Sequence, residues 1–420
     1  MKNISFLLVL VFSCVQKQDT NIFVSTETAS LEIKTSQQNN TSQLDKPYVI
    51  LVSLDGFRYD YAEKYGAKNL LSFDVNAEKM IPSFPSKTFP NHYALATGLY
   101  PGHNGLVSNS FYDRDLDIEY SIRDRGIVEN PNFYSGTPIW GLASEHNMVS
   151  ASMFWVGSEA PIQGNFPTYY YKYNGNISHL DRVNQTIKWL QLPEKERPHL
   201  ITLYFSIIDD LGHTYGPDSK ELAEGVKEID QVIGDLTQKV DQLKLPVNII
   251  IVSDHGMLEV DNTNVIYLEN IIPSDMNVTT SFPAMIYSED SYRIDSLYQK
   301  LTLDTTKFSV YNQSNLPVRY HYDKHLNRIG DLIIMPKPPY TFGKIGKDII
   351  KGSSTHGYDA LYSPEMGAIF YAKGPAFKKN LTVNPFENVN IYPLIAKILD
   401  LNYNEELIDG KLENVKSVLK

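Results

Sequence analysis

A set of short apolar runs, each closed by Gly, Asp or Pro, limits what this chain can fold into. The runs are YVILVSLDG from Tyr48, ASMFWVG from Ala151, HLITLYFSIID from His199, VNIIIVSDHG from Val247 and GAIFYAKGP from Gly367. Nearly continuous Val, Ile and Leu are expected of parallel strands covered on both faces, and helix-like spacing separates several of the runs. The sequence therefore predicts an α/β fold with a doubly wound, mostly parallel sheet flanked by helices.

Three stretches are predicted to be helices of this core. One begins just after Thr88 and runs through HYALATGL, with Pro90 tolerated in its first turn. Another covers residues 221–243, and the third is VNIYPLIAKILDL, residues 389–401. In residues 221–243 apolar side chains recur at three- or four-residue steps, as in an amphipathic helix: Leu222, Val226, Ile229, Ile233 and Leu236.

Residues 270–347 interrupt this alternation of strands and helices. They contain a short predicted helix, YRIDSLYQKL, among weaker strand-like segments such as VRYHY and DLIIMP. We therefore expect a small inserted α+β cap over residues 270–347, between the two parts of a catalytic core formed by residues 46–269 and 348–420.

The N-terminus has the order of an export signal. A charged start at Met1–Asn3 is followed by the apolar run ISFLLVLVF and then by Ser13 and Cys14. The sequence VFSC resembles a bacterial lipoprotein box, which predicts a lipid on Cys14; an ordinary signal peptide with a chance cysteine is the alternative. Because Cys14 is the only cysteine, the mature chain has no disulfide, which is ordinary for a bacterial envelope protein.

Residues 15–45 are rich in Ser, Thr, Gln and Asn and show little hydrophobic periodicity, so they are predicted to be a flexible tether. Together with the signal at residues 1–14, the tether predicts an exported protein of the bacterial cell envelope, in the periplasm or at the outer membrane. We expect membrane attachment only through the lipid on Cys14.

The formal net charge of -11 argues against binding of a nucleic-acid duplex, because such proteins neutralise phosphates with clustered Lys and Arg. If the substrate is anionic, bound cations rather than the protein's own charge must attract it. The negative net charge of the chain therefore favours a metal site.

Candidate ligands for metals follow several of the predicted strands: Asp55, Asp209, His213, Asp254, His255 and His356. Taken alone, an Asp after a strand is more often a turn or cap residue. However, Asp209 and His213 lie four residues apart, a spacing that lets both side chains reach one ion, and the strand ends of such a sheet meet at one edge. Mixed nitrogen and oxygen ligands suit two zinc ions, and a zinc pair suits displacement at phosphorus.

A nucleophile is available in the segment FPSKTFPNHYALATG, where Thr88 precedes a predicted helix. A metal and the positive helix terminus would both lower the pKa of its hydroxyl group. The alternative is that Thr88 only caps the helix.

These residues resemble the type I nucleotide pyrophosphatase/phosphodiesterases of the alkaline phosphatase superfamily. The resemblance covers the chain from Lys46 onward and includes SLDGFR, PSFPSKTFPNHYALATGLYPGHNGLVSN, FWVGSE, LYFSIIDDLGHTYGP, VSDHGM and THGYD in the family order. It implies one zinc on Asp209, His213 and His356, and another on Asp55, Asp254 and His255 with the hydroxyl of Thr88. Asn109 looks like the family asparagine that binds a phosphate oxygen, although it is also consistent with a turn.

The resemblance implies zinc-dependent hydrolysis of nucleotide phosphodiester or pyrophosphate bonds through a covalent threonyl intermediate, releasing a nucleoside 5'-monophosphate. Phe89 and Tyr173 are expected to enclose the base, with Tyr204 and Trp155 nearby, because bases stack on aromatic rings. Core packing is the alternative role for each of these aromatics. Alternative activities are hydrolysis of choline-type or lysophospholipid phosphodiesters, phosphomonoester hydrolysis, and a non-catalytic binding function on the same scaffold.

Overall fold

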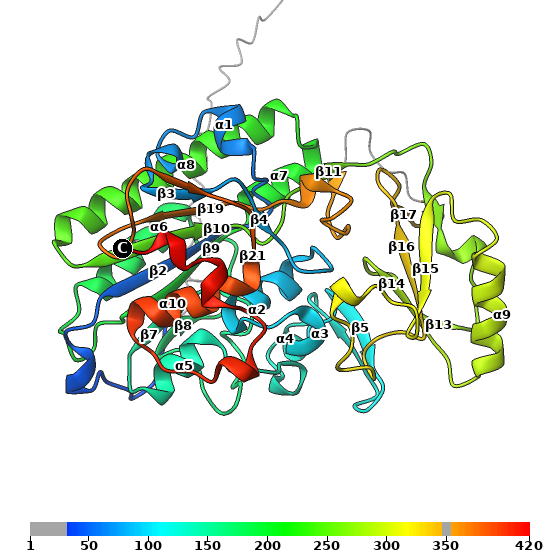
Figure 1. Ribbon diagram of the computed structural model, residues 1–420, viewed down its shortest axis with the longest axis horizontal. Helices are drawn as coiled ribbons and strands as arrows, with labels where there is room; N and C mark the ends of the chain where they lie inside the picture. The colour runs from blue at the N-terminus through cyan, green and yellow to red at the C-terminus, as the bar shows by residue number, and fades with distance from the viewer. Residues whose placement is uncertain (1–31, 347–353) are drawn as a thin grey trace, which may run out of the picture.

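The computed structural model describes residues 32–346 and 354–420 (Figure 1). The predicted signal, Cys14 and half of the predicted tether lie outside the described residues. Within these two ranges, none of the helices combines the length and hydrophobicity needed to cross a bilayer.

The centre of the molecule is a sheet of nine strands (Figure 1). In spatial order they are β1 (Ile33–Lys34), β8 (Tyr169–Tyr171), β7 (Ser150–Met153), β9 (Leu200–Phe205), β2 (Tyr48–Leu54), β10 (Val247–Val252), β19 (Phe370–Lys373), β3 (Val75–Ala77) and β20 (Leu381–Val383). The strands β8, β7, β9, β2 and β10 are parallel, whereas β19 runs antiparallel to β10. The predicted α/β fold with a mostly parallel sheet is confirmed.

Side chains of β2 alternate between two layers of helices, because successive strand residues point to opposite faces of the sheet. Ile50 and Val52 belong to a core with α6 (His179–Leu190) and α8 (Lys220–Leu243). Val49 and Leu51 belong to the opposite core, with α2 (Thr88–Thr97), α5 (Ile139–Glu145) and α10 (Ile391–Leu399). The core helices predicted after Thr88, near 221–243 and near 389–401 are therefore present.

A second sheet lies to one side of the large one, at the right of Figure 1. Its strands, in spatial order, are β13 (Asn277–Thr279), β14 (Ala284–Tyr287), β16 (Leu332–Pro336) and β15 (Phe308–Asn312). The helix α9 (Ser291–Leu301) packs on this sheet through Ile294, Leu297 and Leu301, which form a separate small core with strand residues. This arrangement falls within the segment predicted to be an inserted cap.

One predicted strand of this region is wrong. The segment VRYHY forms a 3-10 helix at Val318–Tyr320, followed by His321 in the left-handed conformation with φ of 52°. Pro317 precedes the turn and Tyr320 stacks on Phe84 with ring centroids 3.6 Å apart. Tyr320 is buried whereas Val318 is 90% exposed, so this segment packs against the core through one side of a turn.

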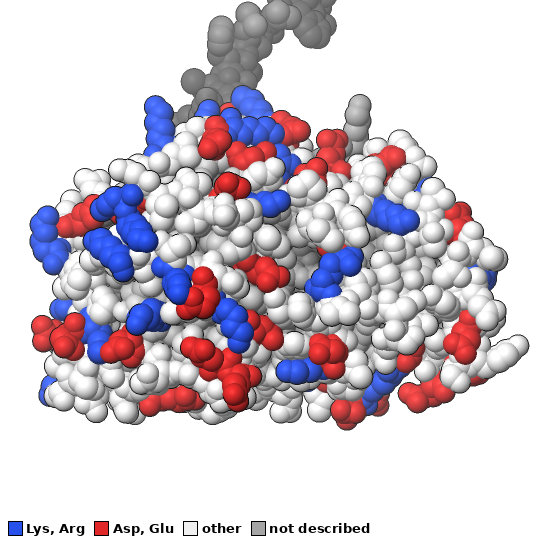
Figure 2. Space-filling view, in the orientation of Figure 1, with Lys and Arg blue, Asp and Glu red and all other residues white. Residues whose placement is uncertain are grey.

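The face of the molecule in Figure 2 carries intermixed Lys, Arg, Asp and Glu side chains. Among the described residues on this face there is no continuous basic stripe of the kind that follows a nucleic-acid backbone.

Candidate active site

The structure gathers all six predicted metal ligands at the carboxyl ends of the central strands. Asp55 follows β2 directly, and Asp254 with His255 follows β10. Asp209 was predicted to end its strand, but it lies in the first turn of α7 (Ile207–Tyr215), which begins two residues after β9. His213 lies one turn later on this helix, so that the four-residue spacing brings its Nε2 to 3.5 Å from Asp209 Oδ1. His356 approaches the same oxygen, with its Nε2 at 3.7 Å.

The second half of the cluster centres on His255. Its Nε2 lies 2.9 Å from Asp254 Oδ2 and 3.6 Å from Asp55 Oδ1. The rings of His255 and His356 stack with centroids 3.6 Å apart, which joins the two halves. Two groups could therefore each hold one cation: Asp55, Asp254 and His255 form one, and Asp209, His356 and His255 form the other, with His213 beside it.

The hydrogen bonds of the three imidazoles determine which nitrogen faces the cluster. Nδ1 of His213 bonds to Ser354 O at 2.9 Å, Nδ1 of His255 to Gly256 O at 3.0 Å, and Nδ1 of His356 to Ser86 O at 2.8 Å. A carbonyl oxygen only accepts, so each Nδ1 carries a proton, and each Nε2 of a neutral imidazole is free to bind a cation. Nε2 atoms and carboxylate oxygens that converge in this way are suited to share a cation.

The carboxylates lead to the same conclusion. Oδ1 of Asp55, Oδ1 of Asp209 and Oδ2 of Asp254 are buried and have no hydrogen-bond donor among the described residues. Burial raises the pKa of Asp55, and the charges of Asp254 and Asp209 raise it further; burial also raises the pKa of Asp209. Buried carboxylates that lack donors are costly, so these side chains fit a site for divalent cations.

Asp254 differs from the other two carboxylates. Burial would raise its pKa, but His255 and His92 outweigh this effect and hold the pKa well below its ordinary value. His92 is a residue that sequence reasoning missed. Its Nδ1 donates to Thr88 O at 2.9 Å and lies 3.3 Å from Asp254 Oδ2, while its Nε2 is 2.8 Å from the hydroxyl of Ser53. The four-residue step from Thr88 to His92 in the helix was the available signal.

Gly56 is required where β2 meets α7. It has a positive φ of 67°, and a Cβ at this position would lie 2.9 Å from the Cα of Asp209. Its N–H donates to Asp254 Oδ1 at 3.1 Å. The glycine therefore lets three ligand-bearing segments approach closely.

Thr88 is the first residue of α2, and its Oγ1 lies 3.3 Å from His255 Nε2. The N-cap position belongs to Lys87, whose backbone is extended. The Thr88 hydroxyl therefore faces the cluster at the positive end of a helix, where a developing negative charge is stabilised.

Lys87 is a second residue that sequence reasoning missed, although a cation next to a candidate nucleophile was a visible signal. Its ammonium group lies 5.1 Å from the centre of the Phe282 ring. Burial lowers the pKa of Lys87 to about 8, while the nearby Asp209 carboxylate raises it. The side chain thus brings a positive charge to the edge of the acidic cluster.

A slot of about 350 Å³ opens beside Thr88 and has the size of a small-ligand site. It is lined by Asp55, Thr88, Phe89, Ile122, Arg125, Val128, Phe154, Trp155, Val156, Gly157, Glu159, Tyr173, Tyr204 and Asp209. The four predicted aromatics are therefore brought together, but with different partners.

Tyr204 and Trp155 are buried supports of the slot, and both bond to the site itself. The Tyr204 hydroxyl donates to Asp55 Oδ2 at 2.5 Å, and Trp155 Nε1 donates to His92 O at 3.0 Å. Tyr173, by contrast, is 42% exposed, and Phe89 is partly buried. Only these two predicted aromatics offer accessible rings for stacking.

A charged pair at the slot was also missed by sequence reasoning. Arg125, at the start of α4 (Arg125–Val128), forms a close ion pair with the buried Glu159. Glu159 ends the FWVGSE motif, which was the available signal for it, whereas Arg125 lies in no motif quoted above. Asn109 lies outside the slot lining; its Oδ1 accepts from Phe89 N at 3.1 Å, which leaves its amide nitrogen as the donor.

Comparison with known proteins agrees with this geometry. A model of the family described as type I phosphodiesterase/nucleotide pyrophosphatase matches residues 49–359. An ectonucleotide pyrophosphatase/phosphodiesterase family member 1 from Rattus norvegicus is 34% identical over 381 residues, which is 86% of this chain but 41% of the rat protein. The chain thus spans about two fifths of the length of that relative. An uncharacterized pyrophosphatase/phosphodiesterase from Schizosaccharomyces pombe is 35% identical and is covered over 79% of its length.

Solved structures show the same fold. Murine ectonucleotide pyrophosphatase/phosphodiesterase 5 superposes with a TM-score of 0.83 at 31% identity, covering 89% of this chain and all of the other. A second structure of that murine protein, an inactive threonine-to-alanine variant in complex with AMP, has the same TM-score. The chain belongs to the type I phosphodiesterase/nucleotide pyrophosphatase family, within the alkaline phosphatase-like superfamily.

Proposed function

We propose that this protein hydrolyses nucleotide phosphodiester or pyrophosphate bonds in a reaction that depends on two zinc ions. One observation carries the proposal: three imidazole Nε2 atoms and three carboxylate oxygens without donors converge beside the Thr88 hydroxyl, next to an aromatic slot. The mixture of His and Asp ligands favours zinc over magnesium or calcium.

The ligands divide between the two ions. Asp209, His213 and His356 would hold one zinc. The other would be held by Asp55, Asp254 and His255, with the Thr88 hydroxyl. Bound zinc would supply Lewis acidity toward phosphate oxygens and would lower the pKa of a bound hydroxyl group.

The chain's own residues would then carry out a double displacement. Thr88 Oγ1 attacks phosphorus, the bond to the leaving-group oxygen breaks, and water hydrolyses the threonyl phosphate to restore the hydroxyl. The Asn109 amide nitrogen would donate to a non-bridging oxygen; its Oδ1 already accepts from Phe89 N, which supports this role. The helix terminus at Thr88 adds a fixed positive potential where charge develops.

We propose a nucleotide substrate because the slot offers Phe89 and Tyr173 as accessible rings for a base, next to Thr88. The structure of the murine neighbour's inactive threonine-to-alanine variant in complex with AMP supports the same choice. Arg125 and Glu159 would face the polar edge of the base. The product is then a nucleoside 5'-monophosphate.

A substrate panel tests the proposal. Nitrophenyl esters of thymidine monophosphate, of phosphorylcholine and of phosphate should be turned over with the nucleotide diester strongly preferred. Thr88→Ala should lower the rate by a factor on the order of a thousand or more while the metal content stays the same. Thr88→Ser is the matched control, because it retains a hydroxyl group and should retain part of the activity. Dominant turnover of the monoester would reject diester hydrolysis, and full activity of Thr88→Ala would reject the nucleophile.

A further inference from the structure

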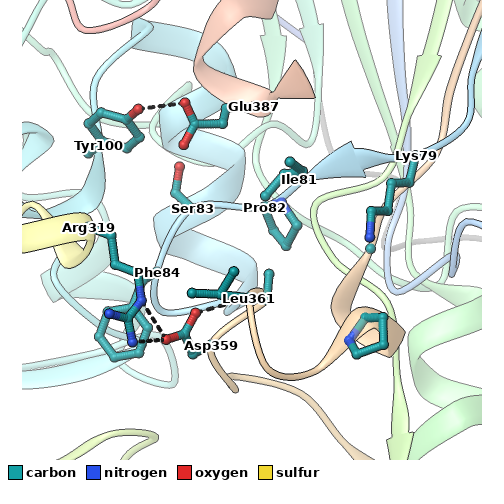
Figure 3. A pocket seen from close by; sticks show the side chains of 13 residues that line it. Lys79, Ile81, Pro82, Ser83, Phe84, Tyr100, Arg319, Asp359, Leu361 and Glu387 are labelled. Atoms are coloured by element: carbon teal, nitrogen blue, oxygen red, sulfur yellow. Dashed lines mark hydrogen bonds and ion pairs between the residues drawn. The ribbon is translucent and has the colours of Figure 1, made fainter. Parts of the chain in front are cut away.

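The structure contains a second pocket, of about 310 Å³ (Figure 3). It is lined by Lys79, Ile81, Pro82, Ser83, Phe84, Tyr100, Arg319, Asp359, Ala360, Leu361, Pro364, Gly367 and Glu387. No residue of the metal cluster and none of the slot residues belongs to this lining. The pocket is therefore a separate compartment of the molecule.

The walls of this pocket are fixed by regular structure and by stacked rings. The strand β4 (Met80–Ile81) pairs with β21 (Phe386–Glu387), which sets Lys79 and Glu387 on neighbouring segments. Phe84 is held by its stack with Tyr320. A preformed cavity of this kind needs little reorganisation to bind a ligand.

Two side chains offer unsatisfied charge to the pocket. The Glu387 carboxylate accepts a hydrogen bond from the Tyr100 hydroxyl at 2.8 Å, and no Lys or Arg among the described residues pairs with it. Lys79 makes no ion pair or hydrogen bond with any described residue; its ammonium group lies 5.9 Å from the centre of the Tyr59 ring. In Figure 3 the Lys79 side chain enters from the side opposite Tyr100 and Glu387.

The other two charged side chains of the pocket, Arg319 and Asp359, pair with each other. Arg319 donates to Asp359 Oδ2 from Nε at 2.9 Å and from Nη2 at 2.6 Å. Apolar side chains of Ile81, Pro82 and Leu361 also line the pocket, and Figure 3 draws Ile81 and Pro82 between Glu387 and Lys79. A fitting ligand therefore carries a cation at one end, an anion at the other and an apolar body between them.

We propose that this pocket binds a small zwitterion with separated charges, specifically a short peptide with apolar side chains and free termini. Its ammonium terminus faces Glu387 and Tyr100, and its carboxylate faces Lys79. A single amino acid does not meet this requirement because its two charges are attached to one carbon atom. In a dipeptide the chain advances about 3.3–3.6 Å per residue, which separates the termini across an apolar body.

The test is calorimetric titration of the metal-loaded full chain with the dipeptide Phe-Leu. We expect binding that Glu387→Gln weakens about tenfold and that Lys79→Met weakens about tenfold, as expected for loss of a charged hydrogen bond. Glu194→Gln and Lys195→Met are matched controls on exposed residues before β9 and should leave the affinity unchanged. Retained nucleotide hydrolysis and thermal stability show that the variants are folded.

Two modified peptides assign the orientation. N-acetyl-Phe-Leu lacks the cation, so its weakened binding should not be reduced further by Glu387→Gln. Phe-Leu amide lacks the anion, so its weakened binding should be insensitive to Lys79→Met. Absence of Phe-Leu binding, equal affinity of all variants, or competition by AMP would overturn the proposal, and none of these results depends on the catalytic assignment.

Discussion

The hydroxyl group of Tyr204 orients Asp55, a proposed metal ligand, because it donates to Oδ2 and leaves Oδ1 facing the cluster. We expect Tyr204→Phe to weaken metal binding about 10- to 100-fold, as loss of such an outer contact does. Metal content measured against a competing chelator checks this prediction. Tyr173→Phe removes a hydroxyl from the same slot and should leave metal affinity unchanged; equal affinities for all three proteins would contradict the role of Tyr204.

The ammonium group of Lys87 lies 5.1 Å from the centre of the Phe282 ring and interacts electrostatically with the Asp209 carboxylate. It is therefore suited to stabilise the phosphate charge that leaves the site. We expect Lys87→Met to lower kcat/KM on a nucleoside triphosphate by about 10- to 100-fold. The loss should be smaller on a nitrophenyl ester, whose leaving group lacks phosphate. Steady-state kinetics on both substrates tests this prediction. Equal losses of kcat/KM on the two substrates would indicate that Lys87 only supports the structure of the site.

At the scale of elements, His103 on α3 (Pro101–Asn104) joins two distant segments of the fold. Its Nδ1 lies 2.8 Å from Asp409 near the C-terminus, and its Nε2 lies 2.6 Å from Asp323, between β15 and β16. Burial alone would lower the pKa of His103, but the hydrogen bonds to Asp409 and Asp323 outweigh it and raise the pKa. The imidazolium form therefore clamps the two segments together.

The sign of the pH dependence follows from this raised pKa. The clamp stabilises the fold fully below the ordinary pKa of about 6.5, and its contribution is lost as the pH rises through the higher folded-state value. His103→Gln should cost about 1 kcal/mol or less near pH 6, because Asp323 is exposed, and still less near pH 9. Urea unfolding at both pH values measures the difference. His146→Gln, whose ring bonds only to backbone groups, should show no such trend.

The elements that sequence could predict are those with a strong period or a dense motif. The continuous apolar run before Asp55 predicts a buried strand, which is β2. The apolar residues from Leu222 to Leu236, spaced three or four apart, predict an amphipathic helix, which is α8. The 3-10 turn at Val318–Tyr320 could not be predicted from its local sequence, because the ring on which Tyr320 stacks, Phe84, lies far away in the sequence. Arg125 and Glu159 were missed for the same reason, since only the fold brings them together.

At the scale of the whole molecule, cations bound at the cluster would hold together segments whose carboxylates otherwise repel one another. Removing them leaves buried carboxylates facing one another, so chelation should abolish activity and lower the free energy of unfolding. The loss is about 2.7 kcal/mol when the free metal had been at about a hundred times its Kd. Thermal unfolding with chelator, and again after zinc is restored, measures this effect. Asp55→Asn should stabilise the metal-free protein and reduce the stabilisation gained when zinc is added. An unfolding temperature that does not change on chelation would contradict the prediction.

We propose that the chain is exported and anchored through a lipid on Cys14, on the basis of its N-terminal pattern. In a bacterial host, labelled palmitate should be incorporated into the protein, and the protein should fractionate with membranes. Cys14→Ser should remove both properties while activity remains, because Cys14 lies far along the chain from every site residue. Release of unlabelled protein from cells carrying the unmodified chain would identify an ordinary signal peptide instead.

Ser86 determines when during synthesis the site can form. Its carbonyl holds His356 Nδ1 at 2.8 Å, and its hydroxyl donates to Tyr358 O at 2.7 Å, so the segment before Thr88 is completed by residues made 270 positions later. A ribosome that has released only the first three quarters of the chain has produced Thr88 but not its full metal cluster. The proposed cation site that includes His356 can therefore form only late in synthesis, and the compartment where folding ends would have to supply that ion.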